Sequence, residues 1–590
     1  MARPARRSGG LVLGLNSVYH ESSACLLDGA EVLAFSEEER FTRVKRAKRL
    51  TLDNADELPL EAIRHCLSST GATWADISHV AYGYDPDLRA PPRGDEDIRP
   101  GGWGSPEGER IFGETVRSIP ALLSKLADRD MESGFRWVSH HRAHAASAYF
   151  ASPFEHAAVL SIDALGEQHS TMLAEGRGIR MEVLREIPYP HSIGFLWEAI
   201  STFLGLDRYA GPAKLMGLAA FGRADRFAAE MSRVLRVGDS TFEVDNHWTR
   251  FRAYGGDRLE ELFGPARPAG SPMDHRDADL ARALQDATEA ALFTLAAWLH
   301  ERTGADALCL AGGVALNCVA TGRLSRESGF SRFFVQPAAN DAGTALGAAL
   351  YVLHHELGCT DRYVMDHPYL GPSFDDEDHR RAIDDAGLPS VRCDDVAAAT
   401  ARLLAGGCVV GWFQGAMEVG PRALGNRSIL ADPRSATVKD AINLRAKHRE
   451  YWRPFSPSVL AEEAAEWLTV GGESLSHGFM SFTYPVRPER RGSIPAAVHA
   501  DGCARAQLVT AALNPRYHRL ISEFRDLTGV PVVLNTSFNG PEEPIVRTPS
   551  EAVAMYRRSG LDALVLGDLV VTDRLNALDV PVDLPAAAPR

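Results

Sequence analysis

The amino-acid sequence predicts an α/β protein with two domains, and three observations support this. The chain begins with short segments rich in Val, Leu and Ala that have the length of strands. A helical pattern at residues 278–304 leads directly into an apolar strand pattern. Residues 362–374 then lose helical periodicity and carry two prolines and a glycine, which favours a junction between domains.

The N-terminal segments LVLGLN, SSACLLDGA and EVLAFSEEE predict three strands. The dipeptide Asp28-Gly29 lies between the second and the third segment and is typical of a tight hairpin. An antiparallel meander therefore opens the chain. A similar strand pattern recurs in AAVLSIDALGE at residues 157–167, and ALCLAGG follows the helix of residues 278–304. We place one domain at residues 1–365 and a second at residues 366–590.

Composition narrows the classes of function. The 590 residues are 45% hydrophobic and 24% charged, as in ordinary globular proteins, and no apolar run approaches the roughly 18 residues of a membrane span. The eight cysteines form no C-x-x-C pair. The formal net charge of -15 disfavours nucleic acid as a partner, because the field of an acidic protein repels polyanions. We expect a cytoplasmic enzyme without a membrane or nucleic-acid partner, and a homodimer remains open.

The segment SHHRAHAASA, at residues 139–148, contains the first candidate site. Ser139 is a suitable helix N-cap, and the alanines favour helix, so His140 and His144 at i and i+4 share one face. Asp163 and Asp341 each close an apolar segment elsewhere in the chain. Two imidazoles and two carboxylates suit a divalent transition metal. The alternative is a hydrogen-bonded histidine cluster on an ordinary helix.

A glycine turn is the second candidate site. Gly312 and Gly313 follow the strand DALCL and precede a helix, where backbone amides can approach phosphate or ribose oxygens. Gly166 with Glu167, and Lys214, are further candidates for nucleotide contacts. Ordinary turns and a surface lysine are the alternative.

The second half of the chain is dense in arginine over residues 412–460. These basic residues alternate with apolar residues and glycine, and polar residues follow later in the chain; the set is Arg422, Arg427, Lys447, Arg449, Arg453, Arg505, Asn535, Ser537 and Asn539. Guanidinium and ammonium groups beside hydroxyl and amide groups suit a pocket for several phosphoryl groups. The alternative is surface arginines paired with carboxylates.

These motifs, in this order, resemble the NodU/CmcH family of O-carbamoyltransferases. The matching motifs are GLN-x(3)-H-x-S-x-A, EEERFTRVK, HHRAHAASA, D-x-x-GE, K-x-MGLA, AGGVALN, ND-x-G-x-x-LGAA, GPRALGNRS and N-T-S-F-N. The chain departs from the family pattern at Ala164, where glycine is usual, and at Pro212, where an acidic residue is usual.

The resemblance implies a fold and a set of site residues. The N-terminal domain would be of the ASKHA class (actin, sugar kinase and Hsp70-like), related to threonylcarbamoyl transferases, and the C-terminal domain would be YrdC-like. His140, His144, Asp163 and Asp341 would hold a metal, with Fe(II) the first choice. Val314, Asn317 and Asn340 would join the nucleotide contacts, and Lys45 the catalytic set.

The resemblance also implies two reactions. Carbamoyl phosphate and a nucleoside triphosphate, ATP with Mg²⁺ as the first choice, would give a carbamoyl nucleotide in the C-terminal domain. The carbamoyl group would then move to a hydroxyl of a small molecule, such as a sugar or secondary metabolite of a natural-product pathway. His20 is the candidate base, with a structural histidine at a turn as the alternative. Neither the acceptor nor the nucleotide base can be read from the sequence.

Three other functions fit the sequence less well. A sugar kinase would explain the N-terminal strands and the glycine turn but leaves the arginine-rich half without a role. A metalloprotease lacks the H-E-x-x-H motif. A tRNA threonylcarbamoyl-modifying enzyme conflicts with the acidic balance of the chain.

Overall fold

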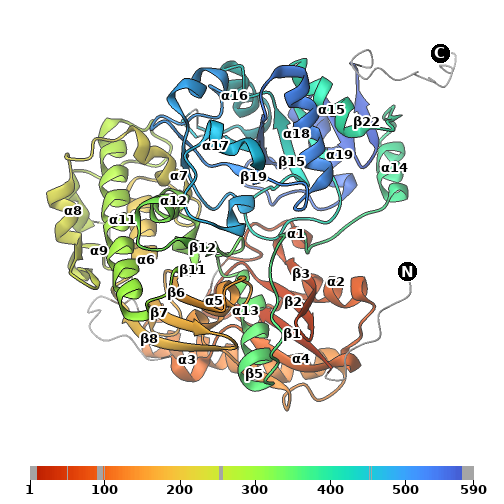
Figure 1. Cartoon of the computed structure of the whole chain (residues 1–590). Coiled ribbons are helices and arrows are strands. Elements are labelled where there is room, and N and C mark those ends of the chain that lie inside the picture. Colours follow the sequence, from red (N-terminus) through yellow and green to blue (C-terminus); the bar gives the residue numbers. More distant parts are fainter. Residues whose placement is uncertain are drawn as a thin grey trace.

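The computed structural model describes residues 10–49, 51–89, 98, 100–251, 257–450, 452–453 and 455–574. Its N-terminal part contains two five-stranded sheets (Figure 1). The first has the spatial order β3 (Glu31–Glu37), β2 (Ser23–Asp28), β1 (Leu11–Asn16), β4 (Ile77–Tyr82) and β5 (Phe135–Trp137). The predicted meander is confirmed, because β1, β2 and β3 pair antiparallel. The hairpin loop consists of Gly29 and Ala30, one residue later than the dipeptide predicted.

The second sheet repeats the topology of the first. Its spatial order is β8 (Arg180–Pro188), β7 (His169–Arg177), β6 (His156–Ile162), β11 (Ala307–Ala311) and β12 (Arg332–Val335). In each sheet three antiparallel strands are followed by two parallel strands, of which one pairs with the first strand of the sheet and the other pairs with that neighbour. This repeated unit fits the ASKHA-type fold implied for the N-terminal part, and the α/β class is confirmed.

Helix α13 (Gly343–Tyr351) is the buried element between the two sheets. It packs against α5 (His140–Tyr149) on one side and against β1, β2 and β4 on the other (Figure 1). Two glycines permit this approach. A Cβ on Gly347 would collide with the carbonyl oxygen of Ala143 in α5, and a Cβ on Gly14 in β1 would collide with that of Ala345. The metal-site candidates at the start of α5 and just before α13 are thereby held together.

The remaining helices of the N-terminal part cover the sheets. Around the first sheet lie α1 (Glu39–Thr42), α2 (Leu60–Thr70), α3 (Pro106–Arg117) and α4 (Ile119–Ala127). Between β8 and β11 come α6 (Ile193–Phe203), α7 (Gly211–Leu218), α8 (Ala228–Val234), the hairpin β9 (Leu235–Val237) and β10 (Phe242–Val244), α9 (Asn246–Thr249), α10 (Glu260–Phe263) and α11 (His275–Thr303). The helix predicted at residues 278–304 is α11. Its N-cap is Asp274, and Gly304, in the left-handed conformation, ends it.

The C-terminal part is built on one mixed eight-stranded sheet. Its spatial order is β13 (Val391–Arg392), β22 (Leu569–Thr572), β21 (Ala563–Leu566), β14 (Val410–Phe413), β15 (Arg427–Ala431), β20 (Val532–Ser537), β16 (Ser456–Leu460) and β19 (Gln507–Val509). The helices of this part are α14 (Asp376–Asp385), α15 (Val396–Ala405), α16 (Thr437–Ile442), α17 (Ala464–Trp467), α18 (Pro515–Thr528) and α19 (Pro549–Ser559), and a small hairpin joins β17 (Tyr484–Pro485) to β18 (Cys503–Ala504). A short π-helical turn at Asn443–Lys447 extends α16.

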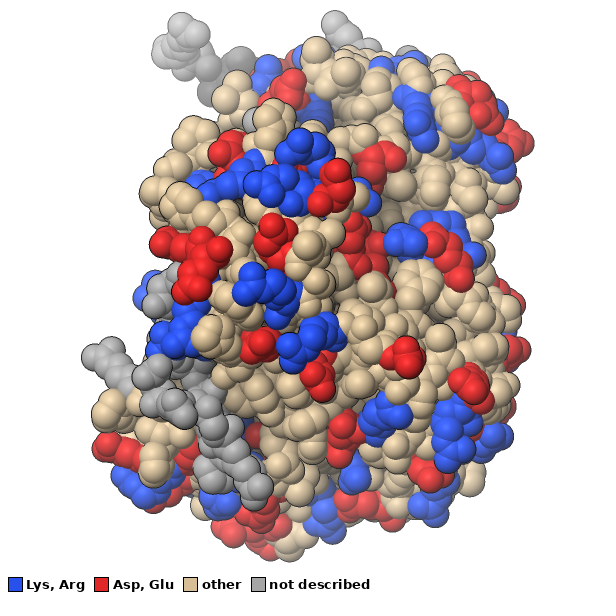
Figure 2. Space-filling view, turned by 90° about the vertical axis from the view of Figure 1, so that its left-hand side faces the viewer, with Lys and Arg blue, Asp and Glu red and all other residues tan. Residues whose placement is uncertain are grey.

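The segment between the two parts, residues 358–375, has no helix or strand. The predicted division at residues 365 and 366 falls within it and stays a prediction. None of the helices in the described part of the chain has the length and apolar character that crossing a membrane requires. On the face shown in Figure 2, basic and acidic side chains are interspersed, and neither sign dominates.

The contact between α13 and α5 yields a first test. Replacing Gly347 by Ala inserts a methyl group where the backbone of α5 already lies, so the two helices must separate. We expect a loss of about 1–3 kcal/mol in the free energy of unfolding, the usual cost of overpacking. Chemical denaturation followed by tryptophan fluorescence measures it. Gly492→Ala is the matched control, because a Cβ there meets no atom within 4 Å. Equal denaturation midpoints for Gly347→Ala and Gly492→Ala would contradict the close packing of α13 on α5.

Candidate functional site

The N-terminus of helix α5 is fixed by a carboxylate from another element. Ser139 occupies the predicted N-cap position but makes no side-chain capping bond. Instead, the Oε1 atom of Glu167 accepts hydrogen bonds from the backbone N–H groups of His140 and Asp85, each at 2.8 Å. A buried carboxylate at a helix N-terminus satisfies an open donor and matches the helix dipole. Glu167 therefore holds His140 in place.

Helix α5 and two strand ends bring together the four predicted metal-site residues. The Nε2 atoms of His140 and His144 lie 3.1 Å apart, and each is 3.2 Å from Oδ2 of Asp163. Oδ1 of Asp341 lies 3.6 and 3.5 Å from the same two nitrogens. One ligand atom from each residue falls within 4.8 Å of all the others. His141, between them, turns away and bonds Ser161 and the carbonyl of His169.

The electrostatics of this cluster fit a bound cation. Burial and the neighbouring Asp163 raise the pKa of Asp341 well above its usual range. Burial opposes ionisation of Asp163 as well, but hydrogen bonds with His140 and His144 hold its pKa well below its usual range. Two buried carboxylates this close repel each other when both are ionised, and a divalent cation removes that repulsion. Two imidazoles with two carboxylates are a donor set that suits a first-row transition metal.

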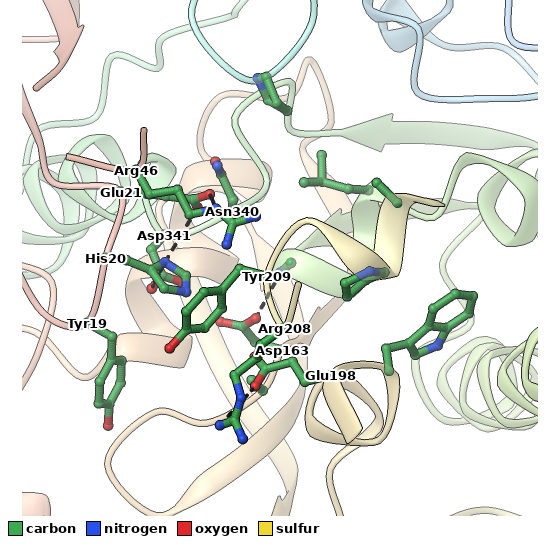
Figure 3. Close-up of a pocket in the computed structure, with 18 of the residues that line it drawn as sticks. Tyr19, His20, Glu21, Arg46, Asp163, Glu198, Arg208, Tyr209, Asn340 and Asp341 are labelled. Atoms are coloured by element: carbon green, nitrogen blue, oxygen red, sulfur yellow. Dashed lines mark hydrogen bonds and ion pairs between the residues drawn. The ribbon is translucent and has the colours of Figure 1, made fainter. Parts of the chain in front are cut away.

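A cavity of about 550 Å³ opens beside the cluster (Figure 3). Asp163 and Asp341 are in its wall, and His20 faces Asp341 with 3.5 Å between Nδ1 and Oδ2. The ring of Tyr209 meets the His20 ring edge-on at 5.2 Å between centroids, and the guanidinium of Arg46 lies 5.0 Å from the centre of the Tyr209 ring. Burial, and then the charge of Arg46, lower the pKa of His20 to about 3, so its ring is neutral. We call this space the metal-side cavity.

The predicted glycine turn contributes to the metal-side cavity. Gly313, Val314, Asn317 and Asn340 are in its wall. The N–H of Gly313 donates to Oδ1 of Asp163 at 3.1 Å, so the turn orients a candidate metal ligand. Gly312 has φ +88° and packs on the backbone of Ile162, where a Cβ would collide.

Three predicted nucleotide-binding residues lie outside the wall. Gly312, Gly166 and Glu167 do not line this cavity, nor do they line a second cavity that lies between the N- and C-terminal parts. Gly312 packs on the backbone of Ile162, and Glu167 caps helix α5, so each has a structural role. A nucleotide role for these residues stays a prediction.

A second cavity, of about 940 Å³, lies between the N- and C-terminal parts and contains most of the predicted basic residues. We call it the basic cavity. Its wall includes the predicted site residues Lys45, Lys214, Arg422, Lys447, Arg449, Arg453, Arg505, Asn535, Ser537 and Asn539. Arg505 donates to the hydroxyl of Ser456, and Arg449 donates to the amide oxygen of Asn443. The structure therefore gathers side chains that are more than 300 residues apart in sequence.

The cations of this cavity are crowded and poorly hydrated. Burial, and then Arg505, lower the pKa of Arg422 to about 9. Burial, and then Arg453, lower that of Arg449 to about 9. Burial also lowers the pKa of Lys447 well below its usual range, and its ammonium donates to Oδ1 of Asn539 at 2.7 Å and to Oγ of Ser537 at 3.2 Å. Polyanions such as phosphates relieve such mutual repulsion.

Of two further predicted residues, one lies in a cavity wall and the other does not. Lys214, predicted as a nucleotide contact, is in the wall of the basic cavity and pairs with Glu450 at 3.0 Å, and its nucleotide role stays a prediction. Arg427 was expected in the phosphate pocket, and this is wrong. It is fully buried, its guanidinium lies 3.6 Å from the centre of the Phe413 ring, and it donates to backbone carbonyls, among them that of Asn426. Arg427 thus braces the loop before β15.

The two cavities share part of their walls. The residues that line both are Lys45, Arg46, Tyr209, Ala213, Met216, Pro421, Arg422, Ser537 and Asn539. The segment after β3 and the region of α7 form this wall together with the C-terminal part. Arg43 donates to the carbonyl oxygens of Pro544 and Ile545, each at 2.7 Å, and Lys45 to that of Glu543 at 3.0 Å. The metal-side and basic cavities are therefore neighbours across a thin wall built from both parts of the chain.

Sequence reasoning missed several wall residues of the metal-side cavity, namely Arg46, Glu198, Arg208 and Tyr209. Arg46 directly follows the EEERFTRVK motif, and Glu198 is the single acidic residue in the apolar helix IGFLWEAISTF. A lone carboxyl in such a helix is a usable signal, because buried acids are rare without a partner. Arg208 and Tyr209 lie in a loop and offer no comparable signal.

Comparison with protein families gives two matches that together span most of the chain. The family described as carbamoyltransferase N-terminus matches residues 11–350, and that described as carbamoyltransferase C-terminus matches residues 401–573.

Curated proteins are similar over most or nearly all of the chain. An uncharacterized protein of Synechocystis is 36% identical over 95% of this chain and 96% of its own. Nodulation protein NolNO of Sinorhizobium fredii is 37% identical over 95% of this chain and 80% of its own. A 3'-hydroxymethylcephem-O-carbamoyltransferase of Streptomyces clavuligerus is 32% identical over 62% of this chain and 65% of its own. Among solved structures, HypF of T. kodakarensis covers 59% of this chain and 48% of its own, with 15% identity and a TM-score of 0.32.

Both family matches fall on the parts that build the two cavities. The N-terminal match contains His140, His144, Asp163 and Asp341, and the C-terminal match contains Arg422, Lys447, Arg449 and Arg505. With these matches and relatives, the chain belongs to the carbamoyltransferase family.

Proposed function

We propose that the protein is a nucleotide-dependent O-carbamoyltransferase that uses carbamoyl phosphate and ATP, the latter with Mg²⁺. The acceptor would be a hydroxyl of a small molecule, such as a sugar or a secondary metabolite of a natural-product pathway. One observation carries the proposal: a cavity crowded with buried cations shares a wall with a cavity that contains a candidate metal cluster. The names of relatives, nodulation proteins and a cephem O-carbamoyltransferase, support a small-molecule acceptor.

The basic cavity would carry out activation. Carbamoyl phosphate and ATP together bring several negative charges, which the crowded cations Arg449, Arg453 and Arg505 would neutralise. With one water molecule consumed, phosphate and pyrophosphate would leave and a carbamoyl nucleotide would form. We assign this step to a YrdC-like domain at residues 366–590, with the NTSFN segment supplying Asn535, Ser537 and Asn539.

The metal-side cavity would carry out transfer. His140, His144, Asp163 and Asp341 would hold Fe(II), which supplies Lewis-acid polarisation of a carbonyl group when bound. His20 is neutral and lies beside Asp341, so it is placed to accept the proton of the acceptor hydroxyl. Because the two cavities share a wall, the reactive nucleotide has a short path between them. A short internal path limits its hydrolysis.

Metal binding yields the first test of this proposal. His144→Ala removes one of the four ligands, so we expect bound iron to fall and carbamoyl transfer to be lost in a folded protein. Elemental analysis of the purified variant, with circular dichroism as the check on folding, measures this. His141→Gln, on the same helix but facing Ser161, should keep its iron. Unchanged metal content in His144→Ala would rule out the assignment.

The two half-reactions yield the second test. Arg449→Ala and Arg505→Ala should lose carbamoyl-phosphate-dependent pyrophosphate release, because each removes a charge-assisted contact worth about 1.5–3 kcal/mol. Both variants should still transfer the carbamoyl group when carbamoyl nucleotide is supplied. Asp341→Ala should release pyrophosphate but not transfer. Failure of Arg449→Ala and Asp341→Ala in the same half-reaction would point to one shared active site.

The proposed base yields the third test. His20→Asn should bind nucleotide normally and lower the rate of transfer by roughly a hundredfold or more, the usual effect of losing a general base. Single-turnover transfer from carbamoyl nucleotide, with nucleotide affinity measured separately, distinguishes the two effects. Wild-type transfer kinetics would return His20 to a structural role.

A further inference from the structure

One end of the metal-side cavity is not shared with the basic cavity. Glu198 of α6 and Arg208 of the following loop are in the wall there. In Figure 3 both side chains point into the cavity near Asp163, and Tyr209 stands beside them. No step described above uses this pair.

The backbone segments that carry both residues are held in place by hydrogen bonds. Helix α6 begins against the strand end of Asp163, because the hydroxyl of Ser192 donates to the carbonyl oxygen of Ala164 at 2.6 Å. The loop that contains Arg208 is closed by Asp207, whose Oδ1 accepts from the N–H groups of Tyr209 and Ala210 at 3.0 and 2.7 Å. Such support keeps a binding group at a defined distance from the cluster.

The ion pair between Glu198 and Arg208 is open. Its shortest nitrogen–oxygen distance is 3.8 Å, beyond hydrogen-bond range. In the wall of the same cavity, Arg40 and Glu37 form a closed pair at 2.9 Å, whereas Arg46 and Glu21 stand 3.9 Å apart. The wall therefore contains both closed and open pairs, and the pair of Glu198 is an open one.

Apart from this open ion pair, the carboxyl group of Glu198 makes no hydrogen bond within the described part of the chain. The side chain of Glu198 is 14% exposed. The aromatic rings of Phe195, Trp197 and Phe251 line the same cavity. A polar group in such surroundings costs free energy until a ligand satisfies it. Burial, partly offset by Arg208, raises the pKa of Glu198 to about 8, so the neutral carboxyl is the main form at pH 7.

We propose that Glu198 and Arg208 position the acceptor and select it. They hold an uncharged oxygen group of the acceptor, so that the reacting hydroxyl faces His20 and the cluster, and they disfavour an ammonium group at that place. The proposal rests on the proposed function: the donor arrives through the shared wall, which leaves the unshared end to the acceptor. A neutral carboxyl can donate to or accept from a hydroxyl, and the adjacent guanidinium repels a cation.

Two probes that differ in one group test the proposal. They are methyl β-D-glucopyranoside and its 2-amino-2-deoxy analogue, and saturation-transfer NMR at pH 7 measures their affinities for the full chain. The wild type should bind the neutral glycoside at least about fivefold more tightly than the amine. Glu198→Ala should weaken binding of the neutral glycoside by about fivefold, the factor that corresponds to one hydrogen bond.

Two further variants separate a binding role from a structural one. Glu198→Gln keeps a neutral hydrogen-bonding group of the same size and should restore affinity to within about twofold of the wild type. Glu243→Ala removes the carboxylate of an exposed Glu–Arg pair with Arg236 and should bind as the wild type does. Equal affinity of wild type and Glu198→Ala, no binding of the neutral glycoside to the wild type, or preference for the amine would each overturn the proposal.

Pyrophosphate release from carbamoyl phosphate and ATP is measured in parallel on the wild type and Glu243→Ala. This measurement tests the proposed function independently of the role of Glu198 and Arg208. If release is absent while the pattern of affinities holds, the carbamoyl-transfer reaction is wrong and the binding site stands. If release is present and Glu198→Ala binds both probes as the wild type does, only the role of Glu198 and Arg208 is wrong.

Discussion

The structure depends on one constraint: groups of like charge are buried side by side in two adjacent places. Asp163 and Asp341 share one site with two histidines, and Arg422, Arg449 and Lys447 share the other. Neither arrangement is favourable without a counter-charge, because burial removes the water that would screen it. Tight packing elsewhere has to hold these groups in place. Helix α13, pressed between α5 and β1 through Gly347 and Gly14, supplies that support for the carboxylates.

Much of the candidate site could be predicted from the sequence, because its residues stand where regular elements end. His140 and His144 lie one helical turn apart, so their convergence follows from helix geometry alone. Asp163 and Asp341 each follow a strand of the second sheet, and those strands run parallel to β11 between them. The α/β class and the N-terminal meander could also be predicted, because strand periodicity and turn residues are local features of the sequence.

The errors arise where tertiary packing decides. The local sequence does not distinguish Arg427, which packs on Phe413, from Arg422, which lines a cavity. Ser139 has the right residue type for a cap, yet it makes no capping bond, and Glu167 from another element accepts from the first amide group of the helix instead. Glu198 was overlooked for a different reason. Its importance follows from the absence of a hydrogen bond to its carboxyl group within the described part of the chain, and this cannot be seen in the sequence.

The wall between the two cavities has a consequence for how such an enzyme can evolve. Arg43 and Lys45 from the beginning of the chain bind backbone carbonyls at Glu543, Pro544 and Ile545 near its other end. Each part therefore lacks a piece of its own cavity when it is alone. A gene split between the two family regions would yield two polypeptides that must reassemble before either pocket is complete. Selection on this shared wall favours keeping both regions in one reading frame.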